Sequence, residues 1–223
     1  MKRKYYEAYD ERYKTIHEKG FSWAGGENTP IVFETIKKYG VPSDAPMLEV
    51  GCGEGMDASF LLEKGFDLFA SDVSPEAISY CKRAFPRFGD RFFVSDCLDD
   101  KNVRRYRFIY SVAVIHMLVR DGDRNGFYGF IRAHLTRDGV ALICTMGDGV
   151  TEIATDEADA FDLVQRDHPS GKVTVASTSL RMVSFPRFES ELASNGLKII
   201  EKGVTSRMPD FDSLMYAVVK IEE

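Results

Sequence analysis

The sequence of 223 residues lacks long apolar runs, since no stretch approaches the roughly 18 consecutive apolar residues of a membrane-spanning helix. Its start, MKRKYYEAYD, has the basic residues of a secretory signal peptide but not the apolar segment that must follow them. Low-complexity tracts and internal repeats are also lacking. We therefore expect a globular cytoplasmic protein without a membrane segment.

Cysteine is scarce and irregularly spaced. The four cysteines occur without a CxxC pair or a nearby CxxxH pair, which are the spacings of zinc sites and redox motifs. We expect reduced thiols rather than disulfides, and no metal site.

Clustered basic residues are nearly absent. The formal net charge is −6, and only MKRK and NVRRYR group several basic residues together. Proteins that bind nucleic acids neutralise phosphates with clustered lysine and arginine. We therefore expect no nucleic-acid partner, and we interpret both clusters as solvated faces.

The sequence does contain a regular alternation of short apolar runs and helical patterns from residue 47 onward. This alternation is typical of a parallel sheet with helices on both faces, and the chain length suits one such domain, 1–223. The expected parallel strands are Met47–Val50, Leu68–Ser71, Phe92–Ser95, Phe108–Val114 and Ala141–Met146.

The chain is expected to end with a helix near Pro186–Ser194 and two strands, Leu197–Lys202 and Leu214–Ile221. Because no helix lies between these strands, they should pair as an antiparallel hairpin. Residues 147–185 depart from the alternation. There we expect a long connection that contains a helix around Asp156–Gln165 and an extended piece at Lys172–Ser177.

Aromatic residues at helical spacing, from Tyr5 to Tyr13, predict an amphipathic helix over residues 4–19. Pro30 is typical of the first turn of a second helix, which Gly40 ends. Two helices therefore precede the alternating region.

A glycine-rich turn at residues 51–56 follows the first strand, and Asp72 ends the second strand 21 residues after the first of these glycines. The NAD fingerprint GxGxxG needs a glycine where Met56 stands, and the carboxylate of Glu49 would oppose a pyrophosphate. S-Adenosylmethionine carries an ammonium and a sulfonium but no phosphate, so these acids favour it. Asp72 can serve a ribose in either case, whereas Asp96 suits an adenine amino group. The turn favours the methyl donor, and an NAD-dependent reductase is the weaker alternative.

These residues, together with YSVAVIHML in the fourth strand, resemble the class I S-adenosylmethionine-dependent methyltransferases. The resemblance covers residues 47–146 and the closing helix and hairpin. It implies a Rossmann-like, doubly wound α/β fold, with a mostly parallel seven-stranded sheet whose last strand is antiparallel. It also implies that the glycines approach the methionine part of the donor, Asp72 the ribose, Asp96 and Cys97 the adenine, and Ser111 the methionyl end. The implied donor-binding set is Glu49, Gly51, Cys52, Gly53, Gly55, Asp72, Val73, Asp96, Cys97 and Ser111.

The YDERY helix followed by Trp23 is similar to the N-terminal lid of the tellurite-resistance and thiopurine methyltransferase subgroup. We therefore interpret residues 1–40 as a helical lid and residues 147–185, which match nothing in the family, as a variable insertion at the acceptor site. Tyr13 and Trp23 would cover the donor, although packing on the sheet explains them equally well. Arg181 would pair with an acceptor carboxylate, unless it forms a surface ion pair.

The acceptor is expected to be a small molecule, and a protein or peptide acceptor is the alternative. The fourth strand lacks the Asn/Asp-Pro-Pro-aromatic loop of amide-nitrogen methylation, and no Pro-Cys nucleophile for cytosine is present. Alignment alone can lower the barrier by up to ~7–11 kcal/mol, so a catalytic base is optional.

His116 is the histidine at the carboxyl end of a predicted strand, which makes it the candidate base or acceptor contact. It stands beside Met117, where many family members have a second histidine, and a structural role is the alternative. Asp72 is expected at an exposed strand end. A catalytically silent protein that binds S-adenosylmethionine as a sensor or partner subunit remains a second hypothesis, and a monomer and a homodimer are both compatible with the sequence.

Overall fold

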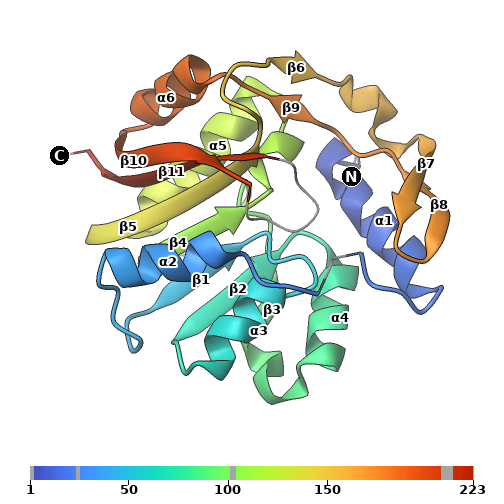
Figure 1. Cartoon of the computed structure of the whole chain (residues 1–223), viewed down its shortest axis with the longest axis horizontal. Helices are drawn as coiled ribbons and strands as arrows, with labels where there is room; N and C mark the ends of the chain where they lie inside the picture. The colour runs from blue at the N-terminus through green and yellow to red at the C-terminus, as the bar shows by residue number, and fades with distance from the viewer. Residues whose placement is uncertain (1–2, 24–25, 101–103, 207–212, 223) are drawn as a thin grey trace.

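Seven strands form one sheet (Figure 1) in the computed structural model, which describes residues 3–23, 26–100, 104–206 and 213–222. Their order is β10-β11-β5-β4-β1-β2-β3. The five strands β1 to β5 run parallel, and β11 is antiparallel to both β5 and β10. The expected fold class and the terminal hairpin are therefore confirmed. The strands are β1 (Met47–Val50), β2 (Leu68–Asp72), β3 (Phe92–Val94), β4 (Tyr106–Val112), β5 (Leu135–Met146), β10 (Leu197–Thr205) and β11 (Leu214–Ile221).

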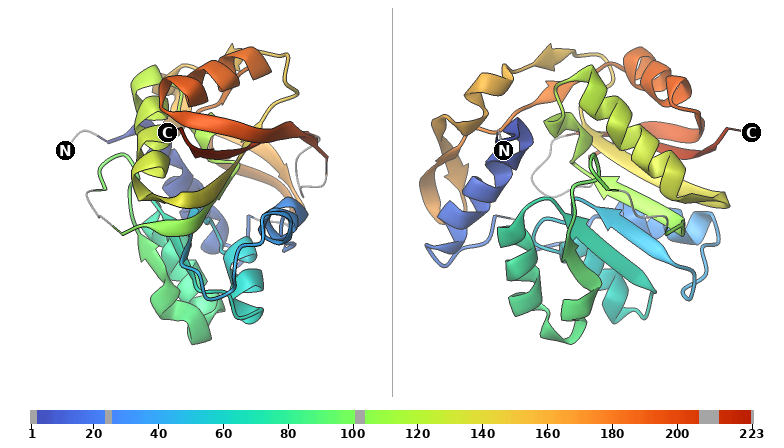
Figure 2. Two further views of the ribbon diagram at one scale, coloured as in Figure 1. Left: turned by 90° about the vertical axis from the view of Figure 1, so that its left-hand side faces the viewer. Right: turned by 180° about the vertical axis from the view of Figure 1, so that it is seen from behind.

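Helices cover both faces of this sheet (Figure 2). They are α2 (Pro30–Lys38), α3 (Met56–Glu63), α4 (Pro75–Ala84), α5 (Asp121–His134) and α6 (Phe185–Ser194). Successive side chains of a strand point to opposite faces. Leu48 and Val50 therefore pack in the cluster that contains α5 and α6, whereas Met47 packs in the cluster of α2, α3 and α4. In the described part of the chain, no helix is both long and apolar enough to cross a membrane.

The fourth strand differs from its expected bounds at its carboxyl end. β4 stops at Val112, two residues before the expected Val114, because Ala113 adopts a left-handed backbone conformation with φ of +56°. This region costs a non-glycine residue roughly 1–3 kcal/mol, and it is found at functional sites more often than elsewhere. The chain turns sharply here, directly above the edge where the parallel strands end.

The prediction of a helix around Asp156–Gln165 is wrong. A short 3-10 helix, η4 (Glu157–Phe161), is followed by strand β7 (Leu163–His168), which pairs antiparallel with β8 (Gly171–Ala176). β8 corresponds to the expected extended piece. The physical reason is tertiary, since the alternate residues of β8 are buried against another helix, and such burial overrides local helix preference.

That other helix is α1 (Ala8–His17), which follows a 3-10 turn, η1 (Tyr5–Glu7), so the expected N-terminal helix is present. Ile16 of α1 forms a small apolar cluster with Val173 and Val175 of β8, and Trp23 packs against it. Figure 1 shows α1 beside the β7–β8 hairpin. The N-terminal helix and the inserted hairpin therefore pack together, although they are far apart in sequence.

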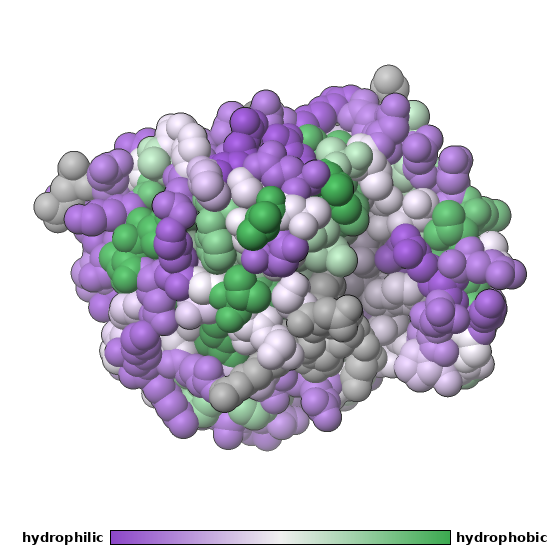
Figure 3. Space-filling view, turned by 45° about the horizontal axis from the view of Figure 1, so that its top comes forward, coloured by the Kyte–Doolittle hydropathy of each residue, from purple (hydrophilic) through white to green (hydrophobic). Residues whose placement is uncertain are grey.

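The surface seen in Figure 3 is mostly hydrophilic, with hydrophobic residues in small groups among polar ones. Exposed large hydrophobic side chains of the described chain include Val150 and Leu163. Scattered exposed hydrophobic residues of this kind are ordinary on a protein surface.

Candidate functional site

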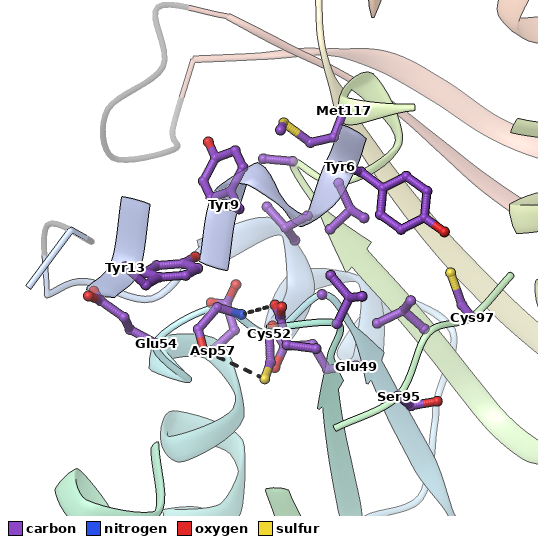
Figure 4. Close-up of a pocket in the computed structure, with 18 of the residues that line it drawn as sticks. Tyr6, Tyr9, Tyr13, Glu49, Cys52, Glu54, Asp57, Ser95, Cys97 and Met117 are labelled. Carbon is purple, nitrogen blue, oxygen red and sulfur yellow. Dashed lines mark hydrogen bonds between the residues drawn. The ribbon is translucent and has the colours of Figure 1, made fainter. Parts of the chain in front are cut away.

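A cavity of about 260 Å³ lies where the parallel strands end, between those ends and the N-terminal segment. In open α/β sheets, ligands bind outside the carboxyl ends of the strands, where the strand order reverses, and here the order reverses between β1 and β4. Figure 4 shows Tyr9 and Tyr13 of α1 on one side of the cavity and Glu49, Cys52 and Asp57 on the other. The position is that of a ligand site.

Eight of the ten residues of the expected donor set line this cavity. Gly55 and Ser111 are not among the described lining residues. Gly55 instead starts α3, and a Cβ atom there would lie 2.9 Å from Cys81 Sγ. Ser111 is fully buried, and Val112, Ala113 and Val114 line the cavity in its place. The eight are Glu49, Gly51, Cys52, Gly53, Asp72, Val73, Asp96 and Cys97.

The glycine turn approaches its neighbours too closely for any side chain. Gly51 and Gly53 have φ of +76° and +51°, in the left-handed region that favours glycine. A Cβ atom on Gly51 would lie 2.2 Å from Val114 Cγ2, and one on Gly53 would lie 2.7 Å from the Tyr13 hydroxyl. The turn therefore presents bare backbone to the cavity, as close contact with a ligand requires.

Asp72 holds this turn in place. One carboxylate oxygen accepts a hydrogen bond from the Gly53 N–H at 2.8 Å, and the other accepts from the Ser74 N–H at 2.8 Å. Burial raises the pKa of Asp72, and these two hydrogen bonds oppose that effect. The expectation of an exposed strand end was wrong, because Asp72 is buried beneath the turn. Its oxygens keep lone pairs that can accept from ligand hydroxyls.

Two further carboxyl groups are buried in the cavity wall. Glu49 accepts a hydrogen bond from the Tyr110 hydroxyl at 3.0 Å, and burial, with a contribution from Asp57, raises its pKa well above the usual range. Burial also raises the pKa of Asp57 to about 6, although the carboxylate accepts from the Thr29 N–H. A bound cation would favour the ionised form of both groups.

Asp96 lies at the opposite end of the cavity and is covered by the N-terminal segment. Its carboxylate accepts hydrogen bonds from Lys4 Nζ at 2.7 Å, the Tyr6 hydroxyl at 2.9 Å and the Leu98 N–H at 2.9 Å. Burial raises the pKa of the neighbouring Cys97 to about 12, so this residue is a neutral thiol. Tyr6 also lines the cavity, a role that sequence reasoning missed.

Glu54 joins the glycine turn to α1, and sequence reasoning missed it as well. Its Oε1 atom accepts from the Trp23 N–H at 2.7 Å and lies 2.8 Å from Nε2 of His17. The other ring nitrogen of His17 lies 2.8 Å from Glu76 in α4. Glu54 is the charged residue of the turn sequence GCGEGM, and this charge could have indicated its role.

Tyr13 and Trp23 line the cavity as expected, but His116 and Arg181 are not among its described lining residues. His116 is buried in η3 (Ile115–Met117), where burial and the Arg124 cation lower its pKa to about 4. Arg181 donates to the Val119 carbonyl and pairs with Asp121 at 2.8 Å. The structure therefore supports the structural alternative for both residues.

The described residues contain no group of three or more histidine, cysteine, aspartate or glutamate side chains that could hold a metal ion. The cavity wall contains aromatic rings, bare backbone and carboxyl groups instead. These groups fit a donor that carries a ribose, an aromatic base and a positive charge, because each has a matching partner in the wall.

Comparison with known proteins gives a sequence match and a fold match. A family model described as a methyltransferase domain matches residues 48–141. The ribosomal RNA small subunit methyltransferase A of Porphyromonas gingivalis is 40% identical over 53 residues, which are 24% of this chain. The match spans 20% of the length of that enzyme.

Solved structures share the fold over nearly the whole chain. An S-adenosylmethionine-dependent methyltransferase from Clostridium acetobutylicum has a TM-score of 0.68 at 17% identity, covering 98% of this chain and 99% of that one. A TehB-like S-adenosylmethionine-dependent methyltransferase from Corynebacterium glutamicum has a TM-score of 0.60 at 20% identity, covering 97% and 98%. The 1,6-didemethyltoxoflavin-N1-methyltransferase of Burkholderia thailandensis, solved with S-adenosylhomocysteine, has a TM-score of 0.69 at 14% identity, covering 97% and 88%.

Proposed function

We propose that this chain is a class I S-adenosylmethionine-dependent methyltransferase and that it transfers the methyl group to a small-molecule acceptor. The observation that carries the proposal is that the glycine turn, Asp72 and Asp96 line the same cavity as the aromatic residues of α1. A cytoplasmic location and the donor contacts of individual residues belong to the same proposal.

The donor would occupy the part of the cavity next to the strand ends. Gly51 and Gly53 would contact its methionine part, Asp72 its ribose hydroxyls, and Asp96 and Cys97 its adenine. When bound, S-adenosylmethionine supplies an activated methyl group and leaves S-adenosylhomocysteine. The chain's own contribution is to orient the reactants and exclude water, since none of the described lining residues is a lysine, arginine or histidine that could serve as a strong base.

A small-molecule acceptor is supported by the size and composition of the site. The cavity of about 260 Å³ is lined on the N-terminal side by Tyr6, Tyr9 and Tyr13. The toxoflavin enzyme, which has the same fold, is named for a small heterocyclic acceptor. The related ribosomal RNA enzyme acts on a nucleic acid, but six carboxyl groups line this cavity, and they would repel a phosphate backbone.

The first test is binding of S-adenosylhomocysteine, measured by titration calorimetry. We expect one site per chain and no binding of NAD(H). Gly53→Ala should weaken this binding at least about tenfold, because the added methyl group would enter the cavity wall.

Gly65→Ala is the matched control. Gly65 also has a positive φ, +83°, but a Cβ atom there meets nothing within 4 Å. Both variants should lose roughly 1 kcal/mol of stability, and only Gly53→Ala should lose ligand affinity. A protein that binds NAD(H) and not S-adenosylhomocysteine would refute the proposed function.

A further inference from the structure

The side of the cavity that faces away from the strand ends indicates which acceptors can enter. The N-terminal segment contributes Tyr9 and Tyr13 of α1, Trp23 and Glu27 to the lining of the cavity, and η3 contributes Met117. Figure 4 shows the rings of Tyr9 and Tyr13 and the Met117 side chain around the open space. Flat aromatic faces and a flexible thioether form a surface on which a planar molecule packs well.

Six carboxyl groups stand among the described lining residues, and no basic side chain does. The six carboxyl groups are those of Glu27, Glu49, Glu54, Asp57, Asp72 and Asp96, and no lysine, arginine or histidine lines the cavity among the described residues. Asp72 lies at the end of β2 and Asp96 just after β3, Glu49 lies in β1, and Glu54 and Asp57 belong to the glycine turn and the start of α3. Glu27 is the acid that the N-terminal segment contributes, and it is exposed.

Two described cations near the cavity, Lys4 and Arg12, are already engaged by other groups. Lys4 pairs with Asp96 and Asp99. Arg12 is buried behind the rings of Tyr9 and Trp23, where its guanidinium donates to the Ala176 and Ser177 carbonyls. An anionic group on an acceptor would therefore meet carboxyl groups in the cavity wall, where none of the described lining residues supplies a cation to offset them.

We propose that the acceptor contains a planar aromatic or heteroaromatic ring and an amino group, on the ring or on a short side chain, or is a neutral compound of the same shape, and that Glu27 selects it against acceptors carrying a carboxylate or phosphate. The aromatic wall favours the ring, and a cationic or hydrogen-bond-donating nitrogen finds both aromatic faces and the Glu27 carboxylate. This inference rests on the proposed function, because it assigns the substrate class of the same site.

The test measures binding to protein saturated with S-adenosylhomocysteine, so that no transfer can occur. The probes are matched in shape: phenethylamine, 2-phenylethanol and 3-phenylpropanoate, together with the corresponding naphthyl series. Trp23 is the only tryptophan of the chain and lines the cavity, so quenching of its fluorescence reports occupancy directly. Calorimetry checks each affinity independently.

We expect each amine to bind at least tenfold more tightly than its carboxylate, with the alcohol between them. Glu27→Gln should lower the affinity for the amine to that for the alcohol. Glu27→Lys should make the carboxylate bind more tightly than the amine. Glu63→Lys, which makes the same charge change at an exposed position outside the cavity wall, should leave the order unchanged.

Two results would overturn the inference: carboxylates that bind as tightly as their amines, or amines that show no binding up to their solubility limits. If Glu27→Lys left the order of the affinities unchanged, the proposed selective role of Glu27 would be refuted. Binding of S-adenosylhomocysteine, measured on every variant, separates these outcomes from failure of the proposed function, in which the donor product itself does not bind.

Discussion

Asp72 combines two tasks in one buried carboxylate. It fixes the glycine turn through the Gly53 N–H and the start of α4 through the Ser74 N–H, and it lines the cavity where the ribose is proposed to lie. Replacement of Asp72 should therefore change both the stability of the fold and the affinity for S-adenosylhomocysteine.

Asp72→Ala should lower the free energy of unfolding by about 1–3 kcal/mol, because it leaves two buried N–H groups without their acceptor. It should also weaken binding of S-adenosylhomocysteine by about 1.5–3 kcal/mol, the usual range for hydrogen bonds to a charged group. Urea unfolding and calorimetry measure the two effects. Asp72→Asn keeps one acceptor oxygen and should show an intermediate loss of stability. Unchanged stability in Asp72→Ala would show that the turn does not depend on this carboxylate.

At the scale of elements, α1 is attached to the rest of the molecule at several points. His17 bridges Glu54 of the glycine turn and Glu76 of α4, and Arg12 donates to the end of the β8 segment at the Ala176 carbonyl. Because Tyr9 and Tyr13 lie on the same helix, these contacts also position the aromatic wall of the cavity. The proposed lid is thus held by polar contacts around a small apolar cluster.

His17→Gln should loosen α1, since a single amide group cannot reach both carboxylates at the positions of the two ring nitrogens. Hydrogen exchange of the α1 amides should become about tenfold faster, which corresponds to about 1.4 kcal/mol. Binding of S-adenosylhomocysteine should restore part of the protection. Glu18→Gln, at the next and exposed residue, is the control. Identical exchange in His17→Gln and the parent protein would mean that the apolar cluster alone holds the helix.

At the scale of the whole molecule, the buried His116 makes stability depend on pH. Its pKa is lowered from the ordinary value of 6.5 to about 4 in the folded chain, so between these values only the unfolded chain takes up the proton. The stabilising contribution is fully present above about pH 6.5 and is lost as the pH falls toward 4. The full loss is on the order of 3 kcal/mol, because the two pKa values differ by roughly 2.5 units and each unit corresponds to about 1.4 kcal/mol.

His116→Gln should therefore flatten the fall in unfolding free energy between pH 6.5 and 4.5, measured by urea unfolding at several pH values. All other titrating groups are common to both proteins, so the difference between the two curves isolates this histidine. Parallel curves over that range would contradict the buried, neutral state of His116. The variant should keep its S-adenosylhomocysteine affinity within about threefold, since His116 is not among the described residues that line the cavity.

The local sequence pattern was sufficient to predict structure where a conformation depends on a few neighbouring residues. The strands from Met47 to Met146 follow apolar periodicity, and the glycine turn with Glu49 and Asp72 follows from backbone conformation and charge. The same logic failed at Asp156–Gln165, where helix-forming residues became a turn and a strand. It failed there because the pairing of β7 with β8 and the burial of β8 against α1 are contacts between distant segments.

The sequence by itself determined the fold class, and it predicted the methyl donor and most of the residues that line the cavity, because periodicity, glycine and charge act over a few neighbouring residues. Only the tertiary structure decided that Glu54, Asp57, Tyr6 and Glu27 share the cavity and that His116 lies outside it. Those placements depend on α1 and the hairpin packing over the strand ends, and on the left-handed turn at Ala113 that directs the chain beyond β4. Contacts between segments more than a hundred residues apart leave no periodic signal in the sequence.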